Sequence, residues 1–331
     1  MSPPEPSPAG WLTINPARVV ADVAVRLREI VHGDLRKRGA VVGLSGGIDS
    51  SVSAALCVEA LGADRVVGLL MPEADSAPET LELSRGVAES LGIEWILEDV
   101  TEILEAVGCY RRRDEAIRSV VPDYGPGWKS KIVLPGLEEG DRLSFFSVVA
   151  ESPAGVRTEA RLTASAYRGV VAATNFKQRT RKMLEYHHAD RLDYAVIGTP
   201  NRLEYDQGFF VKLGDGAADV KPIAHLYKTQ VYALAEQLGL PEEVRSRPPT
   251  TDTYSLAQGQ DEFYFLLPYD KMDLCLYAKV NGLSAEAVAA AVSLEVAVVE
   301  RVFHDIERKR AATRYLHLPP LLLDPPEQAG G

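Results

Sequence analysis

Cysteine is scarce in this sequence. The three cysteines, Cys57, Cys109 and Cys275, lie far apart and form no Cys-x-x-Cys pair. An odd and scattered set of thiols predicts neither a disulfide framework nor a structural zinc site. Such usage is typical of a reducing compartment, so we expect the protein to act in the cytoplasm.

Long apolar runs and an excess of basic residues are also lacking. No apolar run approaches the roughly 18 residues that a membrane-spanning helix needs, and no signal peptide opens the chain. The net charge is -11, whereas binding to a phosphate backbone requires clustered Lys and Arg. We therefore expect neither a membrane nor a nucleic acid as a partner.

Apolar residues are plentiful, and they are arranged in an alternating pattern of strands and helices. Of the 331 residues 46% are hydrophobic, which is enough for one large or two modest cores. β-Branched runs that predict buried strands alternate with segments that predict helices. The first predicted helix is amphipathic, and its apolar stripe consists of Val19, Val23, Val25, Leu27, Ile30 and Val31. The predicted order is helix 16–38, strand 40–45, helix 50–61, strand 65–72, helix 78–92 and strand 93–100.

The same alternation returns in the second half of the chain. Residues 175–190 predict a helix, 192–199 a strand and 227–240 a helix that ends at Gly239. Continuous apolar strands joined by helices indicate a parallel sheet covered by helices on both faces. We therefore predict an α/β, doubly wound fold followed by a helical C-terminal region, whose apolar stripe of core residues is Val296, Val299, Val302, Phe303 and Ile306.

Residues 121–168 interrupt this rhythm. They read as short antiparallel strands, with Ser152–Gly155 as a hairpin tip. We interpret the segment as a small β insertion, either a decorative or oligomer-facing flap or a lid that shapes the substrate pocket. The Pro-rich residues 1–15 predict a disordered arm and residues 316–331 a loose tail, which leaves 16–315 as a single domain.

A glycine-rich turn follows the first predicted strand, in the sequence "VVGLSGGIDSS". Gly46 and Gly47 permit backbone conformations that a Cβ would forbid and allow amides to approach an anion, and the next helix offers its N-terminus to negative charge. No lysine precedes the serines, so the turn is not a P-loop, and it lacks the G-x-G-x-x-G spacing. An acid in such a loop, Asp49, makes sense beside a phosphate only with a cation between them, which suggests Mg²⁺.

The motif "SGGIDSS" resembles the pyrophosphate-binding loop of the ATP pyrophosphatases, which cleave ATP between its α and β phosphates. Residues 196–231, "VIGTPNRLEYDQGFFVKLGDGAADVKPIAHLYKTQV", are similar to the central block of ammonia-dependent NAD synthetases. "RPPTTD" at 247–252 and "ERKRAATRYLH" at 307–317 follow in the order of that family. The resemblance covers about residues 16–110 and 170–315 and implies a Rossmann-like ATP pyrophosphatase fold.

The resemblance also implies roles for individual residues. Asp49 and Glu204 would ligate Mg²⁺, and the catalytic set would be Asp49, Lys212 and Lys228. The acid substrate would contact Arg179, Lys212, Asp219, Arg308 and Lys309. ATP would contact Gly43, Leu44, Ser45, Gly46, Gly47, Ile48, Asp49, Ser50, Leu70, Met71, Thr199, Lys228 and Thr250.

Other polar residues invite a role but have simpler interpretations. Arg179 and Arg181 are two apart on a predicted helix and cannot share one face, so we expect only Arg179 to point into the site. Asp215, in "GDG", is read as a turn former as readily as a ligand. The three histidines His187, His188 and His225 lack partners at ligand spacing, and we expect them to pack or to face solvent.

The implied activity is formation of an amide at the expense of ATP. A carboxylate, in this family deamido-NAD, attacks ATP to give an acyl-adenylate, and ammonia then displaces AMP. Binding partners would be ATP, ammonia and the acid, with a homodimer as the assembly and free ammonia or a separate glutaminase as the nitrogen source. The insertion, Arg308 in place of a usual histidine, and a long aromatic segment after Thr250 all fall where the acid sits or the site closes. Two alternatives therefore stay open: the same chemistry on another carboxylic acid, and a non-catalytic nucleotide-binding protein.

Overall fold

The computed structural model describes residues 10–133, 146–248, 254–256, 258–259 and 264–323, and its centre is a parallel sheet. Four strands follow the order β3-β2-β1-β7 and every neighbouring pair is parallel. Their bounds are β1 Ala40–Leu44, β2 Val66–Leu70, β3 Glu94–Leu97 and β7 Ala195–Ile197. The predicted α/β fold with a parallel sheet is confirmed.

Helices cover both faces of this sheet, as the apolar strands predict. Along β1 the side chains of Ala40, Val42 and Leu44 enter one apolar cluster, whereas Val41 enters the other, because successive strand residues point to opposite faces. The first cluster includes residues of α1 Pro16–Arg28, α2 Ile48–Leu61, α3 Pro78–Ser90 and α8 Lys228–Gln237. The second includes residues of α4 Thr101–Ala106, α5 Cys109–Arg118 and α6 Ala164–Leu192.

Two predicted elements differ in their surroundings or extent. The amphipathic helix 16–38 ends as an α-helix at Arg28 and continues only as a π-helical turn, η2 Glu29–Asp34, and Val25 of its expected apolar stripe is 53% exposed. Strand β3 is not buried, because it lies at the edge of the sheet with one neighbour, and Leu97 is 49% exposed. The prediction of buried, continuous apolar strands is thus wrong for β3.

Helix boundaries shift where capping residues act. The helix predicted at 175–190 is the C-terminal part of α6, which begins at Ala164 because the Thr163 hydroxyl caps it by accepting a hydrogen bond from the Ala166 amide at 3.1 Å. The helix predicted at 50–61 begins at Ile48, directly after Gly47. Gly92 and Gly239 both follow their helices with positive φ angles of 66°, as helix-ending glycines do.

The predicted insertion is an antiparallel sheet of three strands. Its order is β4-β5-β6, with bounds β4 Lys129–Val133, β5 Ser147–Glu151 and β6 Arg157–Arg161. The hairpin tip is where the sequence places it, with the Gly155 amide donating to the Ser152 carbonyl at 2.8 Å. The predicted end at residue 168 is wrong by five residues, because α6 already begins at 164. Ile132 and Val148 pack on Val170 of α6 in one apolar cluster.

The C-terminal region is helical, as predicted. Its buried residues form a cluster that includes Trp11 and Leu203, and Val299, Val302 and Ile306 of the expected stripe are fully buried. Phe303 is partly buried, but Val296 is exposed at the start of its helix. The bounds are α7 Arg202–Gln207, α9 Glu242–Arg245, α11 Tyr269–Asn281, α12 Ala285–Val292 and α13 Val296–Thr313, with short 3-10 turns at η3 Ala63–Arg65 and η5 Arg314–Leu316.

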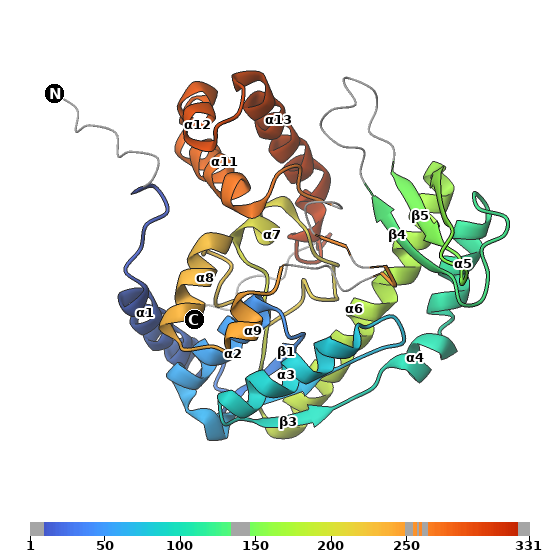
Figure 1. Ribbon diagram of the computed structural model, residues 1–331. Coiled ribbons are helices and arrows are strands. Elements are labelled where there is room, and N and C mark those ends of the chain that lie inside the picture. The colour runs from blue at the N-terminus through green and yellow to red at the C-terminus, as the bar shows by residue number, and fades with distance from the viewer. Residues whose placement is uncertain (1–9, 134–145, 249–253, 257, 260–263, 324–331) are drawn as a thin grey trace.

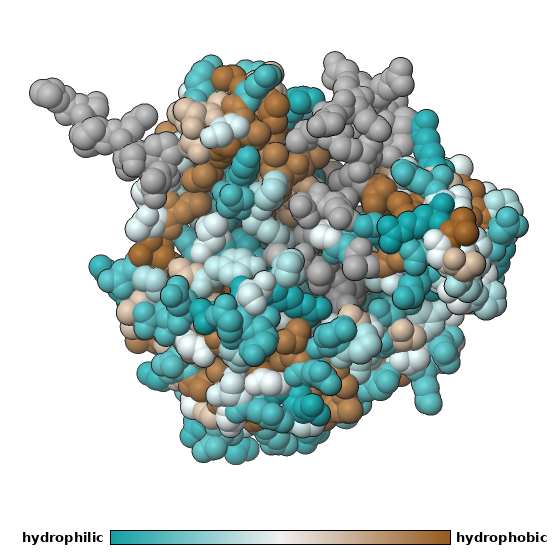
Figure 2. All heavy atoms as spheres, in the orientation of Figure 1, coloured by the Kyte–Doolittle hydropathy of each residue, from teal (hydrophilic) through white to brown (hydrophobic). Residues whose placement is uncertain are grey.

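Figure 1 shows the C-terminal helices α11–α13 at the top of the view and the insertion at the right, with α6 running up to the insertion. On the face seen in Figure 2, hydrophobic residues gather over the C-terminal helices, whereas hydrophilic residues cover most of the lower part of the molecule. Among the helices that the structure describes, none combines the length and apolarity required to span a bilayer.

Candidate active site

The order of strands creates a natural binding place above β1. The chain runs from β1 to β2 and β3 on one side and returns as β7 on the other, so the segments that leave β1 and β7 diverge. Ligands of doubly wound sheets bind at such a switch point, beyond the carboxyl ends of the strands. A cavity of about 560 Å³ lies there, lined by the loop after β1, by Thr199 after β7 and by one side of α6.

Most of the predicted site residues line this cavity. Gly46 of the predicted ATP loop does not line it, and Thr250 lies outside the described residues. The predicted site residues that line the cavity are Gly43, Leu44, Ser45, Gly47, Ile48, Asp49, Ser50, Leu70, Met71, Arg179, Thr199, Glu204, Lys212 and Lys228.

The glycine loop owes its shape to one of its two glycines. Gly46 has φ = 67°, and a Cβ there would lie 2.8 Å from the Cβ of Leu83, so no side chain fits. Gly47 has an ordinary φ of -88°, so the expectation that it needs a conformation forbidden to other residues is wrong. The Ser50 and Ser51 hydroxyls both donate to the Gly47 carbonyl, at 3.0 and 2.8 Å, and hold the first turn of α2.

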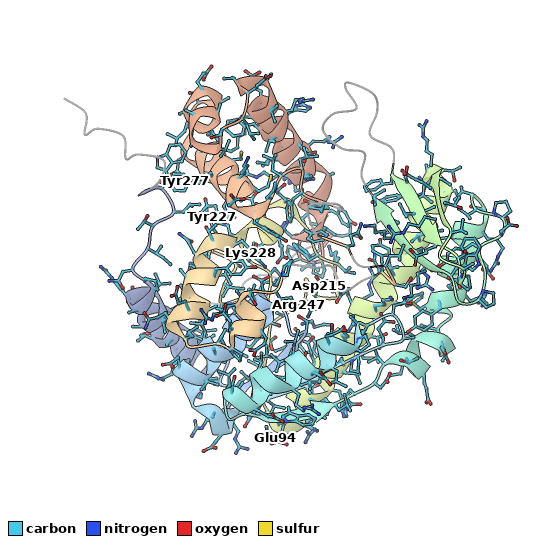
Figure 3. The ribbon with its side chains drawn as sticks, in the orientation of Figure 1. Glu94, Asp215, Tyr227, Lys228, Arg247 and Tyr277 are labelled. Carbon is cyan, nitrogen blue, oxygen red and sulfur yellow. The ribbon has the colours of Figure 1, made fainter. Side chains whose placement is uncertain are left out.

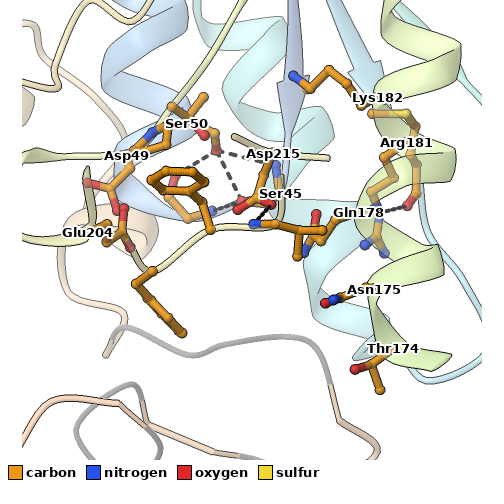
Figure 4. A pocket seen from close by; sticks show the side chains of 18 of the residues that line it. Ser45, Asp49, Ser50, Thr174, Asn175, Gln178, Arg181, Lys182, Glu204 and Asp215 are labelled. Carbon is orange, nitrogen blue, oxygen red and sulfur yellow. Dashed lines mark hydrogen bonds between the residues drawn. The ribbon is translucent and has the colours of Figure 1, made fainter. Parts of the chain in front are cut away.

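A buried charge centre stands beside this loop. Asp49, on the first turn of α2, forms an ion pair with the Lys228 ammonium at the start of α8. The Asn201 side-chain amide donates to Asp49 Oδ1 at 3.3 Å, and the Asn201 backbone amide donates to Glu204 Oε2 at 3.1 Å. Asn201 therefore ties both carboxylates together, and Figure 4 shows Asp49 and Glu204 side by side.

This buried centre contains two carboxylates, those of Asp49 and Glu204, but only one ammonium, that of Lys228. Burial, followed by the nearby charge of Asp49, raises the pKa of Glu204 to about 8. For Lys228, which is 2% exposed, burial alone would lower the pKa, but the carboxylates of Asp49 and Glu204 outweigh it and raise the pKa. When both acids are ionised, one ammonium faces two carboxylates, which favours uptake of a cation.

The donor set fits Mg²⁺ rather than a transition metal. Within the described ranges, no three His, Cys, Asp or Glu side chains gather as a metal site. Two carboxylates at the mouth of a phosphate loop match Mg²⁺, which takes one or two carboxylates and fills its shell with water and substrate phosphates. Asp49 and Glu204, the pair predicted from the sequence, are the residues that would hold it.

Two predicted contacts for the acid substrate lie on the opposite wall. Arg179 Nε donates to the Lys212 carbonyl at 3.3 Å, and Lys212 Nζ donates to the carbonyls of Tyr315 and Leu318 at 2.8 and 3.1 Å. The chain's C-terminal turn thus positions Lys212 at the cavity. Both cationic side chains are available to an anionic group that replaces or joins these carbonyls.

Three other predicted substrate contacts are not among the residues that line the cavity. Asp219 accepts from the Val196 amide at 2.8 Å and so fixes the end of β7. Lys309 is held by Asp305 at 2.6 Å and lies over the Tyr264 ring, 4.4 Å from its centroid. Arg308 pairs with the same aspartate at 2.7 Å but is otherwise exposed. Their contact with a substrate stays a prediction.

Helix α6 contributes a polar face that the sequence analysis missed. Asn175, Gln178, Lys182 and Glu185 follow one another at helical spacing, and all four line the cavity. Lys182 and Glu185 form a buried ion pair at 2.5 Å, and burial raises the pKa of Glu185 despite that lysine. The spacing of three, four and three residues could have revealed this face from the sequence. Because the predicted helix began at residue 175, the sequence analysis did not show that the helix continues towards residue 164.

Arg181 and Asp215 also line the cavity. Arg181 Nε donates to the Met71 carbonyl at 3.0 Å, so the prediction that only Arg179 of the two arginines faces the site is wrong. Asp215 accepts from the Val211 amide at 2.8 Å, the turn-forming role, and burial raises its pKa. Figure 3 labels Asp215, Lys228 and Arg247 close together in the centre of the molecule.

Of the three histidines that were expected to pack or to face solvent, His225 is exposed and His188 is buried, but His188 does have a carboxylate partner. His188 Nε2 lies 2.8 Å from Glu98 Oε1, on the far part of α6 from the insertion. Among the described residues that line the cavity there is no histidine.

Comparison with known proteins gives a consistent result. Residues 19–120 and 154–314 match the family described as NAD synthase. The chain is 63% identical over 311 residues to the NH₃-dependent NAD⁺ synthetase of Rhizobium meliloti, with 94% of this chain and 92% of the relative covered. Two solved structures, an NMN synthetase from Francisella tularensis and an NH₃-dependent NAD synthetase from Campylobacter jejuni, align with TM-scores of 0.61 at 21% and 22% identity. They cover 95% and 94% of this chain and 100% of their own chains.

Proposed function

We propose, because this chain belongs to the NAD synthase family, that it is an ATP-dependent enzyme that forms NAD⁺ from deamido-NAD and ammonia. The observation that carries the proposal is the buried centre of Asp49, Glu204 and Lys228 beside an anion-binding loop at the switch point of the sheet. The cavity continues from that centre along α6, which leaves room for an acid next to ATP.

The reaction balances in two steps. A carboxylate oxygen of the substrate attacks the α-phosphorus of ATP, the bond to the bridging oxygen breaks, and pyrophosphate leaves. Ammonia then attacks the acyl carbon, a C–N bond forms, the C–O bond to AMP breaks, and one proton is released. A carboxylate alone is a poor acyl donor because its leaving group would be oxide, and adenylation removes that difficulty.

The protein's part is positioning and neutralisation. Lys228 sits at the N-terminus of α8 and the glycine loop at the N-terminus of α2, so both offer positive potential to the departing pyrophosphate. Asn201 holds Asp49 and Glu204 in place through its two hydrogen bonds. Mg²⁺ held by these two acids would offset phosphate charge when Mg-ATP binds.

A coupled assay tests the proposal. The purified protein is incubated with Mg-ATP, an ammonium salt and deamido-NAD, and both AMP and NAD⁺ are quantified. We expect AMP and NAD⁺ in equal amounts, and no AMP when the acid is omitted. ATP cleavage that yields no NAD⁺ would refute the proposed acid.

The alternatives are separated by the same assay. AMP release on addition of another carboxylic acid, with none on addition of deamido-NAD, would assign the same chemistry to a different substrate. No ATP cleavage with any acid would assign a non-catalytic, nucleotide-binding role. Ammonia as the direct nitrogen donor, with a separate glutaminase as its source, and action in the cytoplasm remain part of the proposal.

A further inference from the structure

The insertion brings an aromatic surface into the cavity. Three aromatic residues line one end of it: Phe146, next to β5, Tyr167 on α6, and Tyr254. The rings of Phe146 and Tyr167 are stacked, with centroids 4.2 Å apart and planes inclined by 14°. All three belong to the apolar cluster at the base of the insertion, and we call them the aromatic wall.

One member of this wall, Phe146, lies outside the residues that match the family, whereas Tyr167 and Tyr254 lie inside them. The family match leaves out residues 121–153, the range that contains β4, β5 and Phe146. The insertion also holds Tyr254 in place, because β4 binds the segment that carries it. The Ser130 amide donates to the Ser255 hydroxyl at 2.9 Å, and the Leu256 amide donates to the Ser130 carbonyl at 3.2 Å.

The wall lies far from the reacting centre. The residues of α6 that line the cavity extend from Tyr167 to Glu185, which at 1.5 Å per residue is about 27 Å of helix. Glu185 adjoins the glycine loop, since its Oε1 lies 3.0 Å from where a Cβ on Gly43 would be. A substrate whose carboxyl reacts beside Asp49 and Lys228 reaches the wall only with its far end.

The chemistry of the wall suits a base. Aromatic side chains stack on the flat faces of nucleobases, and amide side chains can bind the edge of adenine through two hydrogen bonds. Asn175 and Gln178 lie on α6 between the wall and the glycine loop, and both line the cavity. Figure 4 shows both side chains directed from α6 into the cavity.

We propose that Phe146, Tyr167 and Tyr254 form a stacking subsite for the adenine ring at the far end of the dinucleotide acid, so that the insertion selects a dinucleotide over a mononucleotide. This inference rests on the proposed function, because deamido-NAD supplies an acid at one end and an adenine at the other. The mononucleotide made of its acid half ends before the wall and gains nothing from it.

Calorimetric titration of two ligands into the full chain tests the subsite. The ligands are deamido-NAD and nicotinic acid mononucleotide, and the variants are Phe146→Leu and Tyr167→Leu. Because stacking of one base contributes about 1–3 kcal/mol, we expect the Kd of deamido-NAD to rise roughly tenfold or more while that of the mononucleotide is unchanged. KM for ATP should also stay the same.

Trp128→Leu is the matched control. Trp128 packs against the same apolar cluster of the insertion but does not line the cavity. It should leave both Kd values unchanged. An equal loss for both ligands, a Trp128→Leu effect as large as that of Tyr167→Leu, or a rise only in KM for ATP would overturn the subsite.

Two further readouts keep the outcome decisive. If a leucine variant does not fold, Tyr167→Trp keeps a ring in place, and its fluorescence should be quenched by deamido-NAD but not by the mononucleotide. Absence of that quenching would count against the subsite. If the wild type forms no NAD⁺ from deamido-NAD, the proposed function and the subsite fall together, whereas NAD⁺ formation with unchanged Kd values in the variants refutes the subsite alone.

Discussion

Asp49 and Lys228 meet across 179 residues of sequence, and each is in place because of a helix start. Asp49 is on the first turn of α2 and Lys228 is the first residue of α8, so both lie where helix dipoles favour anions. Without a bound cation, the single ammonium of Lys228 balances only part of the charge of the carboxylates of Asp49 and Glu204. A phosphate–metal complex is therefore the natural complement of this centre.

Changing Asp49 to Asn should remove turnover, because it removes one of the two proposed cation ligands while keeping the size of the side chain. We expect at least a hundredfold loss in the rate of AMP and NAD⁺ formation, since removing a single stabilising group commonly has that effect. Asp64→Asn, at an exposed position on η3, is the control and should behave as wild type. Full activity in Asp49→Asn would show that the metal assignment is wrong.

Asp273 is a buried acid with a structural task near the same centre. It lies on α11, and its Oδ2 accepts from the Thr229 amide at 2.8 Å, which caps the start of α8 next to Lys228. Burial raises its pKa from 3.8 to about 6. The folded protein therefore holds a proton on Asp273 that the unfolded chain loses between pH 3.8 and 6.

Stability consequently falls as the pH rises through that window, and the cost stays constant above it. A shift of about two pKa units corresponds to a cost on the order of 3 kcal/mol. Asp273→Asn, which can still cap α8, should have a higher free energy of unfolding than wild type at pH 8, with the difference vanishing below pH 4. Urea titrations across this pH range measure it, and a difference that does not depend on pH would contradict the assigned cause.

Helix α6 is the element that joins the two ends of the site. Its polar face lines the cavity, while Lys177, on another face, is 1% exposed and binds Glu73 at 2.8 Å and Asp75 at 2.7 Å. Arg113 also pairs with Asp75, and the Tyr110 hydroxyl donates to Glu73 at 2.7 Å. These contacts fasten the segment after β2 to α5 and α6. Met71, Pro72 and Ser76 of that segment line the cavity.

Lys177→Met should therefore weaken the attachment of the segment after β2, which lines the nucleotide side of the cavity. Removing one partner of a buried ion network leaves uncompensated carboxylates, and we expect the free energy of unfolding to fall by about 3–5 kcal/mol. KM for ATP should rise more than kcat falls, because the segment after β2 would no longer be held. The control Lys37→Met breaks only a surface pair with Asp193, so its effect on the free energy of unfolding should be small. An unchanged KM for ATP would show that the network serves stability alone.

On the scale of the whole molecule, the site is assembled from segments distributed over most of the chain. The residues around it come from the loop after β1, from α6, from the segment after β7, and from Thr313 and Tyr315 near the end of α13. Both the insertion, through Phe146, and the C-terminal helices contribute to its lining. The cavity is thus formed by the entire tertiary structure rather than by one motif.

The predicted assembly is a homodimer, and sedimentation at several concentrations measures it. The chain mass is 36.1 kDa, so a species of twice that mass is expected at micromolar concentration and above. The prediction derives from the family resemblance, which also suggests that the acid substrate is bound across the interface. Persistence of the 36.1 kDa species at every concentration, together with full activity, would show that one chain completes the site alone.

The sequence by itself determined the chemistry of the phosphate side. The strand–"SGGIDSS"–helix pattern is local, so the positive φ of Gly46, the start of α2 directly after Gly47 and the place of Asp49 follow from residues within a few positions of one another. The parallel sheet and the β insertion were equally readable, because alternation of apolar residues depends only on the face that each strand buries. The roles of Glu204 and Lys228 were predicted from the resemblance of residues 196–231 to the central block of the family.

The tertiary structure decided what depends on contacts distant in the sequence. Exposure of β3 follows from its place at the sheet edge, which no local pattern shows. Arg181, Lys182 and Glu185 became lining residues because α6 crosses above β1, and Asp219 was drawn to the end of β7 rather than to the cavity. The aromatic wall exists because Ser130 of β4 holds Ser255, 125 positions further along the chain, and so keeps Tyr254 in the same apolar cluster as Tyr167, an arrangement that only packing can specify.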